Sequence, residues 1–415
     1  MKKRVNETTK SRNAMDVEMY MKILIVGTGA QGSVIATEIV KSPEVSEVRL
    51  SDIDLGKAGQ LAERLKSEKV YTHRVDANRI NDVMKVARDV NVIVNTTTLN
   101  AKFDLNIMEA ALNVGAHYQD LASYGTEQLA LSDRWKEAGL TALIDTGVSP
   151  GFSNVLVAQA ADKLDRVEEI RIRLWGGVES KKPASFWSPE TAWMDMALEP
   201  VIYENGKYKK VPPFSGEEVY NFPDPVGPQT VFWHSHEEPE TLPRFIGKGV
   251  KYVDFKMGGP DFPLVKTIIE LGLMDDKPIN VKGVKVAPRD VFLALVPPTP
   301  SMEEVERMIK AGMINMKMCC AVDVKGQKEG AEVRYILYSN FMDIHELKKR
   351  MPGANPVAYM TSVPASIFTK MLIHGRIKTR GVIPPEALEP AVRQAFIAEL
   401  AEKGITVREK VESLV

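Results

Sequence analysis

The chain has 415 residues, of which 44% are hydrophobic and 26% are charged, and its formal net charge at pH 7 is -1. This length exceeds what one hydrophobic core usually serves, so two domains are expected. The balanced charge excludes the basic surface typical of nucleic-acid binding, and no apolar run is long enough to span a membrane.

Residues 1–20 are polar and charged without an apolar segment, which excludes a secretory signal and predicts a disordered extension. The two cysteines, Cys319 and Cys320, are adjacent and poorly placed to bridge each other. A disulfide framework is therefore excluded, and a cytoplasmic location is expected.

A glycine-rich turn follows the apolar run 22–26 and opens a stretch of helical periodicity. Its residues are Gly27, Thr28, Gly29, Ala30, Gln31 and Gly32. The first glycine permits a tight turn, the second lets backbone N–H groups approach a pyrophosphate, and the third lets helix and strand pack closely. The strand, turn and helix context predicts a dinucleotide site at the helix N-terminus.

Asp52 ends a second predicted strand, 20 residues beyond Gly32, where a carboxylate accepts hydrogen bonds from a ribose 2′-hydroxyl. The alternative is a solvated acid behind a glycine-rich turn. A carboxylate repels a 2′-phosphate, and no Arg lies beside Asp52 and Asp54. NAD is therefore predicted as the cofactor in preference to NADP.

Strands and helices alternate up to residue 149 in the manner of a doubly wound parallel sheet. Strands are predicted over 22–26, 47–51, 70–74, 90–94, 117–120 and 140–145, and helices over 30–41, 55–66, 79–88, 104–114 and 127–138. These elements predict a complete Rossmann domain over residues 21–149.

Polar residues follow the predicted strands, at the edge of the sheet where such folds bind ligands. They are Asp76, Asn95, Thr96, Thr97, Asp120, Ser123 and Tyr124, and Gly147 after the sixth strand is a further candidate for cofactor binding. Asp76 is a candidate for the adenine amino group or for a helix N-cap, and the threonines contact the cofactor or simply end a strand. Asp120 and Tyr124 are candidates for proton transfer; the alternatives are a capping acid and a packing residue.

A second domain is predicted over 150–360 and a C-terminal helical segment over 361–415. Ser153 is the expected N-cap of a helix through Ala161, and the alternation in 167–175 predicts a strand with one solvated face. The Pro- and Gly-rich region 183–299 predicts long ordered loops around a site. A capping box at Ser301, a strand over 332–338 and a helix over 385–403 follow.

Two histidines and an arginine lie close together in the second domain, at His234, His236 and Arg244. A zinc site lacks a third ligand of suitable spacing, so no metal is predicted. Arg244 suits a substrate carboxylate, and His236 suits an acid or base near neutral pH; the alternative is a solvated surface loop. The methionines around Cys319 are predicted to fill the core.

The segments 95–103, 117–124, 147–154, 361–367 and 381–386 resemble the saccharopine dehydrogenase family of the reductase type. That family includes lysine 6-dehydrogenase, carboxynorspermidine synthase and homospermidine synthase. The resemblance implies an α/β fold with a Rossmann domain, a second mixed α/β domain, C-terminal helices returning to the first domain, and a homodimer or higher oligomer. It also places Thr97 and Ser123 near the substrate.

The chemistry that the resemblance implies is hydride transfer between a nicotinamide and the carbon of a C–N bond, through an imine, on a lysine-, saccharopine- or polyamine-like amine. Asp52 departs from the Arg expected of NADP-using members, which favours an NAD-linked, oxidative role. Two alternatives are a homospermidine-synthase-like transferase with recycled NAD and a non-catalytic NAD-binding regulator.

Overall fold

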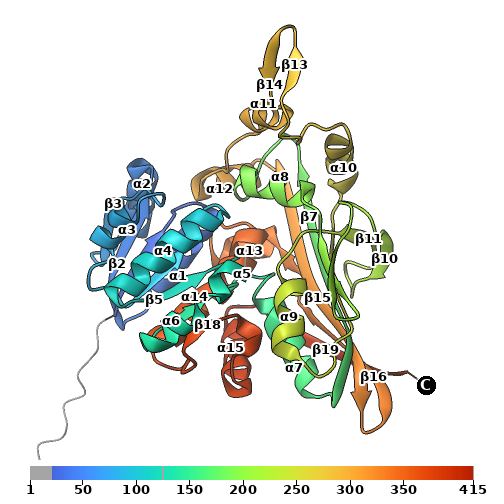
Figure 1. Cartoon of the computed structure of the whole chain (residues 1–415). Coiled ribbons are helices and arrows are strands. Elements are labelled where there is room, and N and C mark those ends of the chain that lie inside the picture. The colour runs from blue at the N-terminus through green and yellow to red at the C-terminus, as the bar shows by residue number, and fades with distance from the viewer. Residues whose placement is uncertain (1–20, 124–125, 415) are drawn as a thin grey trace, which may run out of the picture.

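A computed structural model describes residues 21–123 and 126–414 of the chain. Its N-terminal part is a seven-stranded parallel sheet with the order β18-β6-β5-β4-β1-β2-β3 (Figure 1). The strands are β1 (Met21–Val26), β2 (Val45–Asp52), β3 (Val70–Arg74), β4 (Val92–Asn95), β5 (His117–Asp120), β6 (Thr141–Leu143) and β18 (Gly381–Ile383). The strand order reverses between β1 and β4, so the predicted Rossmann sheet is confirmed.

The helices of this part are α1 (Ala30–Ile39), α2 (Leu55–Leu65), α3 (Ile80–Val86), α4 (Ala101–Val114), α5 (Thr126–Leu129) and α6 (Ser132–Glu137). The single helix predicted over 127–138 is wrong, because the chain turns between α5 and α6. This turn lets Gln128 of α5 reach Asp120 while Trp135 of α6 is buried in the core.

Alternate residues of β1 pack into two different cores, as the period of a strand requires. Ile23 and Ile25 belong to a large core that continues through α1 into the second domain. Leu24 and Val26 belong to a smaller core against α3 and α4. Both faces of the sheet are therefore buried, which is typical of a parallel sheet.

The second domain is built on a ten-stranded mixed sheet. Its strands are β7 (Arg166–Ser180), β8 (Val201–Glu204), β9 (Lys207–Lys210), β10 (Glu218–Asn221), β11 (Pro228–Trp233), β12 (Tyr252–Gly258), β15 (Ile314–Lys328), β16 (Ala331–Ser339), β17 (Met342–Asp343) and β19 (Val407–Leu414). Strands β7 and β12 are parallel and the other pairs are antiparallel, which confirms a mixed sheet.

The prediction of a solvated face on the 167–175 strand is wrong at Arg173. This side chain is fully buried in β7, where it lies 2.7 Å from both Asp254 and Glu218. Arg173 is buried because it pairs with acids on other strands, whereas Arg171 pairs with Glu169 of the same strand and both remain partly exposed.

The Pro-rich region 183–299 contains regular elements as well as loops, so the prediction of long loops is only partly right. Its helices are α8 (Pro189–Ala197), α9 (Glu238–Ile246), α10 (Phe262–Glu270) and α11 (Pro288–Leu295), and a small hairpin joins β13 (Ile279–Val281) to β14 (Val284–Val286). A proline lies in the first turn of each of these four helices. Proline has no N–H to lose at that position and thus favours a helix start.

Helix α7 (Phe152–Asp162) begins after Gly151, not after Ser153. Gly151 has a φ of 125°, and its N–H donates to Oδ1 of Asn154 at 2.8 Å. The predicted N-cap is therefore wrong, and the hydroxyl of Ser153 instead donates to Glu238 at 2.8 Å. The capping box predicted at Ser301 is confirmed, and it starts α12 (Met302–Lys310).

The C-terminal part returns to both sheets. Helix α13 (Ile344–Arg350) precedes α14 (Pro356–Ile373), which packs against α1 of the first domain. A short 3-10 helix (Pro385–Ala387) and α15 (Pro390–Glu402) follow β18, and β19 then pairs with β16. The predicted return of C-terminal helices is confirmed, and each sheet also gains a strand from this segment. No helix in the described ranges has the length and apolar character needed to cross a bilayer.

Candidate active site

Two adjoining cavities lie at the carboxyl ends of the Rossmann strands. The larger has a volume of about 1160 Å³ and follows the glycine-rich turn. Of the predicted cofactor-binding residues, those that line it are Gly27, Thr28, Gly29, Ala30, Gln31, Asp52, Asp76, Asn95, Thr96 and Thr97. We call it the nucleotide cavity. Gly32 lies beneath the turn, and Gly147 lines neither cavity.

The glycine-rich turn leaves room for a dinucleotide at one position and excludes side chains at two others. A Cβ on Gly32 would lie 2.1 Å from the carbonyl oxygen of Gly27, and one on Gly27 would lie 2.7 Å from that of Thr96. A Cβ on Gly29, in contrast, would meet nothing within 4 Å. The backbone is thus bare where a pyrophosphate would lie at the start of α1, and the geometry fits a dinucleotide.

Asp52 is held in place by hydrogen bonds from Thr28 of the glycine-rich turn. Its Oδ2 accepts from the backbone N–H of Thr28 at 2.8 Å and from the Thr28 hydroxyl at 2.9 Å. Lys57, at the start of α2, lines the same cavity and is exposed. A carboxylate that favours NAD and an ammonium that favours a 2′-phosphate therefore line the same cavity.

The hydroxyls after β4 are used within the protein. Thr96 donates to the carbonyl of Gly27 at 2.7 Å, and Thr97 donates to Oδ1 of Asn95 at 2.7 Å. Asp76 accepts from the N–H of Asn78 at 3.0 Å and does not cap α3, which begins after Arg79. These residues line the cavity while their polar atoms hold its wall together.

Asp120 is buried and lines neither cavity. Its two oxygens accept from the N–H of Asp145 at 2.8 Å and from the amide of Gln128 at 2.7 Å. Burial raises the pKa of Asp120 to about 7 against the lowering effect of these donors. This placement does not support proton transfer to a substrate. Tyr124 lies outside the described residues.

The smaller cavity has a volume of about 250 Å³ and lies between the two domains. It shares with the nucleotide cavity the residues Gln31, Leu99, Ala122, Ser149, Trp187, Thr191 and Thr361. Its lining includes four carboxylic acids, Asp195, Glu237, Glu240 and Asp261, and no Lys or Arg among the described residues. We call it the acidic pocket. Ser123, predicted near the substrate, lines it, and its hydroxyl donates to Asp145 at 2.9 Å.

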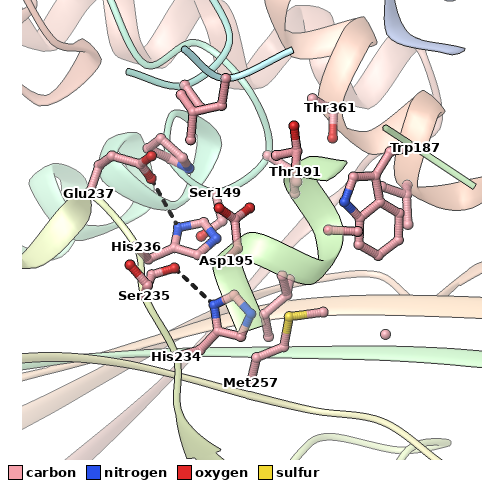
Figure 2. A pocket seen from close by; sticks show the side chains of 18 of the residues that line it. Ser149, Trp187, Thr191, Asp195, His234, Ser235, His236, Glu237, Met257 and Thr361 are labelled. Atoms are coloured by element: carbon pink, nitrogen blue, oxygen red, sulfur yellow. Dashed lines mark hydrogen bonds and ion pairs between the residues drawn. The ribbon is translucent and has the colours of Figure 1, made fainter. Parts of the chain in front are cut away.

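His236 projects from the loop between β11 and α9 into the acidic pocket (Figure 2). Its ring stacks on Phe255 with centroids 3.8 Å apart, and its Nδ1 lies 2.7 Å from Oε2 of Glu238. Glu238 is fully buried and also accepts hydrogen bonds from Ser149 and Ser153.

The Glu238 carboxylate determines which nitrogen of His236 exchanges a proton. Burial would raise the pKa of Glu238, but the His236 charge and three hydrogen bonds outweigh it and lower that pKa. Glu238 is therefore ionised and can only accept, so Nδ1 of His236 carries a proton. The Nε2 atom remains to take up or release a proton in the pocket.

Asp195 and Glu237 lie on two sides of the His236 ring (Figure 2). Burial raises the pKa of Asp195 to about 7, and His236 lowers it by a smaller amount. The pKa of Glu237 is raised by burial and by Asp145, Glu238 and Asp195. Nδ1 of His236 lies 3.5 Å from Oε2 of Glu237, but no Lys or Arg lines the pocket among the described residues. Burial therefore outweighs the attraction to His236 and disfavours the charged forms of both carboxyl groups.

His234 also lines the acidic pocket, with its ring centroid 5.7 Å from that of His236. Its Nδ1 lies 2.8 Å from the Ser235 carbonyl, and burial lowers its pKa to about 3. Within the described residues, His236, Glu237 and Glu238 offer atoms within 4.8 Å of one another that could ligate a metal. His234 does not belong to that group, so the histidine pair does not form it.

Arg244 lies in the last turn of α9, is exposed and lines neither cavity. Its predicted role as a carboxylate anchor is not supported by this placement. Sequence reasoning missed Asp195, Glu237 and Glu238 as site residues. Glu237 and Glu238 could have been predicted, because they follow His236 directly in the sequence. Asp195 could not, because a single acid on a short helix is common.

Two family models match the chain: the saccharopine dehydrogenase NADP binding domain over residues 23–143 and the saccharopine dehydrogenase C-terminal domain over residues 147–405. The chain is 26% identical to carboxyaminopropylagmatine dehydrogenase of Synechocystis, over 94% of this chain and 98% of that one. It is 26% identical to carboxynorspermidine synthase of Vibrio cholerae, over 89% and 93%. The fold is that of saccharopine dehydrogenase (L-Glu forming) from Saccharomyces cerevisiae, with a TM-score of 0.70, 16% identity, and coverage of 94% and 100%.

Proposed function

Since the chain belongs to the saccharopine dehydrogenase family of nucleotide-dependent oxidoreductases, we propose that it transfers hydride at the C–N bond of a polyamine-like amino acid. The substrate would resemble the compounds in the names of its relatives, carboxynorspermidine and carboxyaminopropylagmatine. Its chain would carry positive charge beyond the nitrogen that reacts.

The acidic pocket is the observation that carries this proposal. It adjoins the nucleotide cavity and offers four carboxylic acids without Lys or Arg among the described residues. Saccharopine carries several carboxylates, which would meet Asp195 and Glu237 without a Lys or Arg to compensate their charge. An ammonium or guanidinium there would instead pair with both groups and relieve the cost of their ionisation.

The nicotinamide nucleotide, when bound, accepts or supplies the hydride. In the oxidative direction the substrate carbon loses a hydride and its nitrogen loses a proton, which leaves an imine; reduction is the reverse. Nε2 of His236 would exchange the proton at that nitrogen or at the water that adds to the imine. Glu238 holds the tautomer that this role requires, and Phe255 holds the ring plane.

NAD is the proposed cofactor because Asp52 lies where a 2′-phosphate would be placed. The description of the matched domain names NADP, and Lys57 lies in the same cavity. The test of function must therefore use both nucleotides.

The test is a steady-state assay of the full chain, followed by absorbance of the reduced nucleotide. Carboxynorspermidine, carboxyaminopropylagmatine, saccharopine and lysine are each offered with NAD and with NADP. We expect kcat/KM for one of the two polyamine-like compounds to exceed that for saccharopine by roughly a hundredfold, as expected when a buried charge is paired in one case and opposed in the other. A higher kcat/KM for saccharopine or lysine would refute the assignment.

A further inference from the structure

Ser149 lies at the boundary between the nucleotide cavity and the acidic pocket. It belongs to the segment 147–154, one of those on which the family resemblance depends. Ser149 lines both cavities, whereas His236 lines the acidic pocket alone (Figure 2). In the proposed reaction a hydride crosses this boundary between the nucleotide and the substrate, so the hydroxyl of Ser149 lies close to the bond that reacts.

The loop that carries Ser149 is held by its own backbone. The N–H of Gly147 donates to the carbonyl of Leu121 at 3.1 Å, and the carbonyl of Gly147 accepts from the N–H of Phe152 at 2.9 Å. A Cβ on Gly151 would lie 2.4 Å from the carbonyl oxygen of Gly147, so the loop closes tightly on itself. A fixed backbone of this kind is what a side chain needs to hold a substrate atom in place.

Glu238 determines which way the hydroxyl of Ser149 points. The hydroxyl donates to Oε1 of Glu238, and the other oxygen of that carboxylate, Oε2, lies 2.7 Å from Nδ1 of His236. A hydroxyl has one proton to donate and two lone pairs, so Ser149 can only accept a hydrogen bond from a ligand. One carboxylate therefore orients two acceptors, the oxygen of Ser149 and Nε2 of His236.

Two acceptors suit a ligand atom that carries two hydrogens. The protonated nitrogen of a secondary amine is bonded to two carbons and two hydrogens, and it is the atom at which the proposed reaction takes place. An ionised carboxylate has no hydrogen to donate and would find no partner at either acceptor. The boundary between the cavities therefore favours the substrate nitrogen.

We propose that Ser149 is a second catalytic residue of the proposed reaction, on which this inference rests. Its hydroxyl oxygen accepts one N–H of the substrate nitrogen, and Nε2 of His236 accepts the other. His236 removes its proton, the neighbouring carbon gives its hydride to the nucleotide, and the electron pair that the proton left on nitrogen forms the C=N bond. The N–H held by Ser149 stays on the nitrogen throughout.

This hydrogen bond should act mainly on the rate of hydride transfer. The nitrogen is a neutral amine once His236 has taken the proton, and it becomes a cationic iminium as the hydride leaves. A hydrogen bond from a charged donor is stronger than one from a neutral donor, so the bond to Ser149 strengthens as the reaction proceeds. An interaction that strengthens toward the transition state raises kcat.

Ser153 provides the matched control. Its hydroxyl donates to the same oxygen of Glu238, at 2.8 Å, but Ser153 is fully buried and lines neither cavity. Replacing either serine by Ala removes one hydrogen bond to Glu238. Ser149→Ala alone also removes a group that reaches the substrate.

The first test measures kcat and KM of the full chain with whichever of the two polyamine-like compounds is more active. Ser149→Ala should lower kcat roughly fiftyfold and Ser153→Ala about threefold, because only the former loses a hydrogen bond to a charged ligand. An equal loss in both variants would refute contact with the substrate. A large loss of nucleotide affinity in Ser149→Ala would assign the hydroxyl to the nucleotide and also refute it. Thermal melting checks that both variants are folded.

A second test uses binding alone. The affinity for the substrate is measured by calorimetry with the reduced nucleotide bound, because the amine cannot be oxidised in that complex. An analogue methylated at the reacting nitrogen keeps its positive charge and has one N–H fewer. Methylation should weaken binding to the wild type by roughly tenfold or more and binding to Ser149→Ala much less, as expected of two changes that remove the same contact.

Equal losses on methylation in the wild type and in Ser149→Ala would refute the contact while leaving the proposed function intact. A wild type that neither binds nor oxidises either polyamine-like compound would refute the proposed function, and the role of Ser149 with it.

Discussion

The two adjoining cavities are built in opposite ways. The nucleotide cavity is formed mainly by backbone and short side chains that follow consecutive parallel strands, and its polar atoms are largely bonded to one another. The acidic pocket is formed by side chains from α8, from the loop before α9 and from α14, and its acids Asp195 and Glu237 face His236 but no Lys or Arg among the described residues. The nucleotide cavity is thus preformed, whereas the buried acids of the acidic pocket need a cationic ligand to balance their negative charge.

The largest expected effect is on nucleotide affinity, from a substitution in the glycine-rich turn of the nucleotide cavity. Gly29→Ala should lower nucleotide affinity by roughly a thousandfold, because the methyl group would occupy the place of the pyrophosphate. The melting temperature should stay near that of the wild type, since the added Cβ meets nothing within 4 Å. Fluorescence titration with NAD and NADP, together with thermal melting, measures both quantities.

Gly32→Ala is the matched control for that variant. Its Cβ would lie 2.1 Å from the carbonyl of Gly27, so it should lower the melting temperature as well as the affinity. Equal melting temperatures for the two variants would contradict the view that one glycine serves the ligand and the other serves packing.

The acidic pocket should respond to the loss of one charge. Asp195→Asn keeps the shape of the side chain and should lower kcat/KM for the polyamine-like substrate by roughly a hundredfold, mainly through KM. Nucleotide affinity should not change. Glu199→Gln removes a charge from an exposed residue just after α8 and should have little effect; an equal loss in both variants would indicate a general charge effect.

The pH dependence of substrate binding also tests whether the charge of Asp195 binds the substrate. The pKa of Asp195 is about 7, because burial disfavours its charged form. As the pH rises from 6 to 8, Asp195 ionises and the KM of a cationic substrate should fall by about tenfold. In Asp195→Asn this dependence should flatten, leaving only the part due to other groups. An unchanged pH profile would assign the dependence elsewhere.

Cofactor choice should change by a smaller factor. Asp52→Asn removes the charge that opposes a 2′-phosphate and should shift the NAD-to-NADP affinity ratio about fivefold toward NADP, the effect of one solvated charge at close range. Lys57→Gln should shift the ratio the other way. If NADP already binds more tightly than NAD to the wild type, the role given to Asp52 is wrong.

The smallest expected effect is on thermal stability and concerns Asp104, a buried carboxyl group for which no ligand partner is proposed. Burial raises the pKa of Asp104 to about 8, and its Oδ2 has no hydrogen-bond partner. Its folded-state pKa lies above the unfolded value, so its contribution to stability is complete below about pH 4 and is lost as the pH rises through 8.

Asp104→Asn should therefore melt about 2 to 4 °C higher than the wild type at pH 9, with a smaller difference at pH 6. Asp133→Asn, at an exposed position, should show no such trend. A difference that does not grow with pH would indicate that Asp104 is not the titrating group.

Much of the first domain follows from the sequence alone. Its strands, its glycine-rich turn and the acid that ends β2 are determined by neighbouring residues, because strand period and turn geometry are local properties. Six of the seven strands of the Rossmann sheet, β1 to β6, and the glycine-rich turn at the edge of a large cavity were accordingly predicted with nearly correct bounds. The resemblance to one family extended this to the mixed second domain and the returning C-terminal helices.

The acidic pocket was decided by tertiary structure. It brings together side chains from near residues 195, 236 and 361, and no local pattern specifies which residues meet across such separations. Glu238 and Arg244, both in α9, show why closeness in the sequence does not place two side chains in the same site. Six residues of an α-helix turn through about 600°, so the two side chains leave on different faces. Packing of α9 against α7 and the mixed sheet buries the first against His236 and leaves the second in solvent.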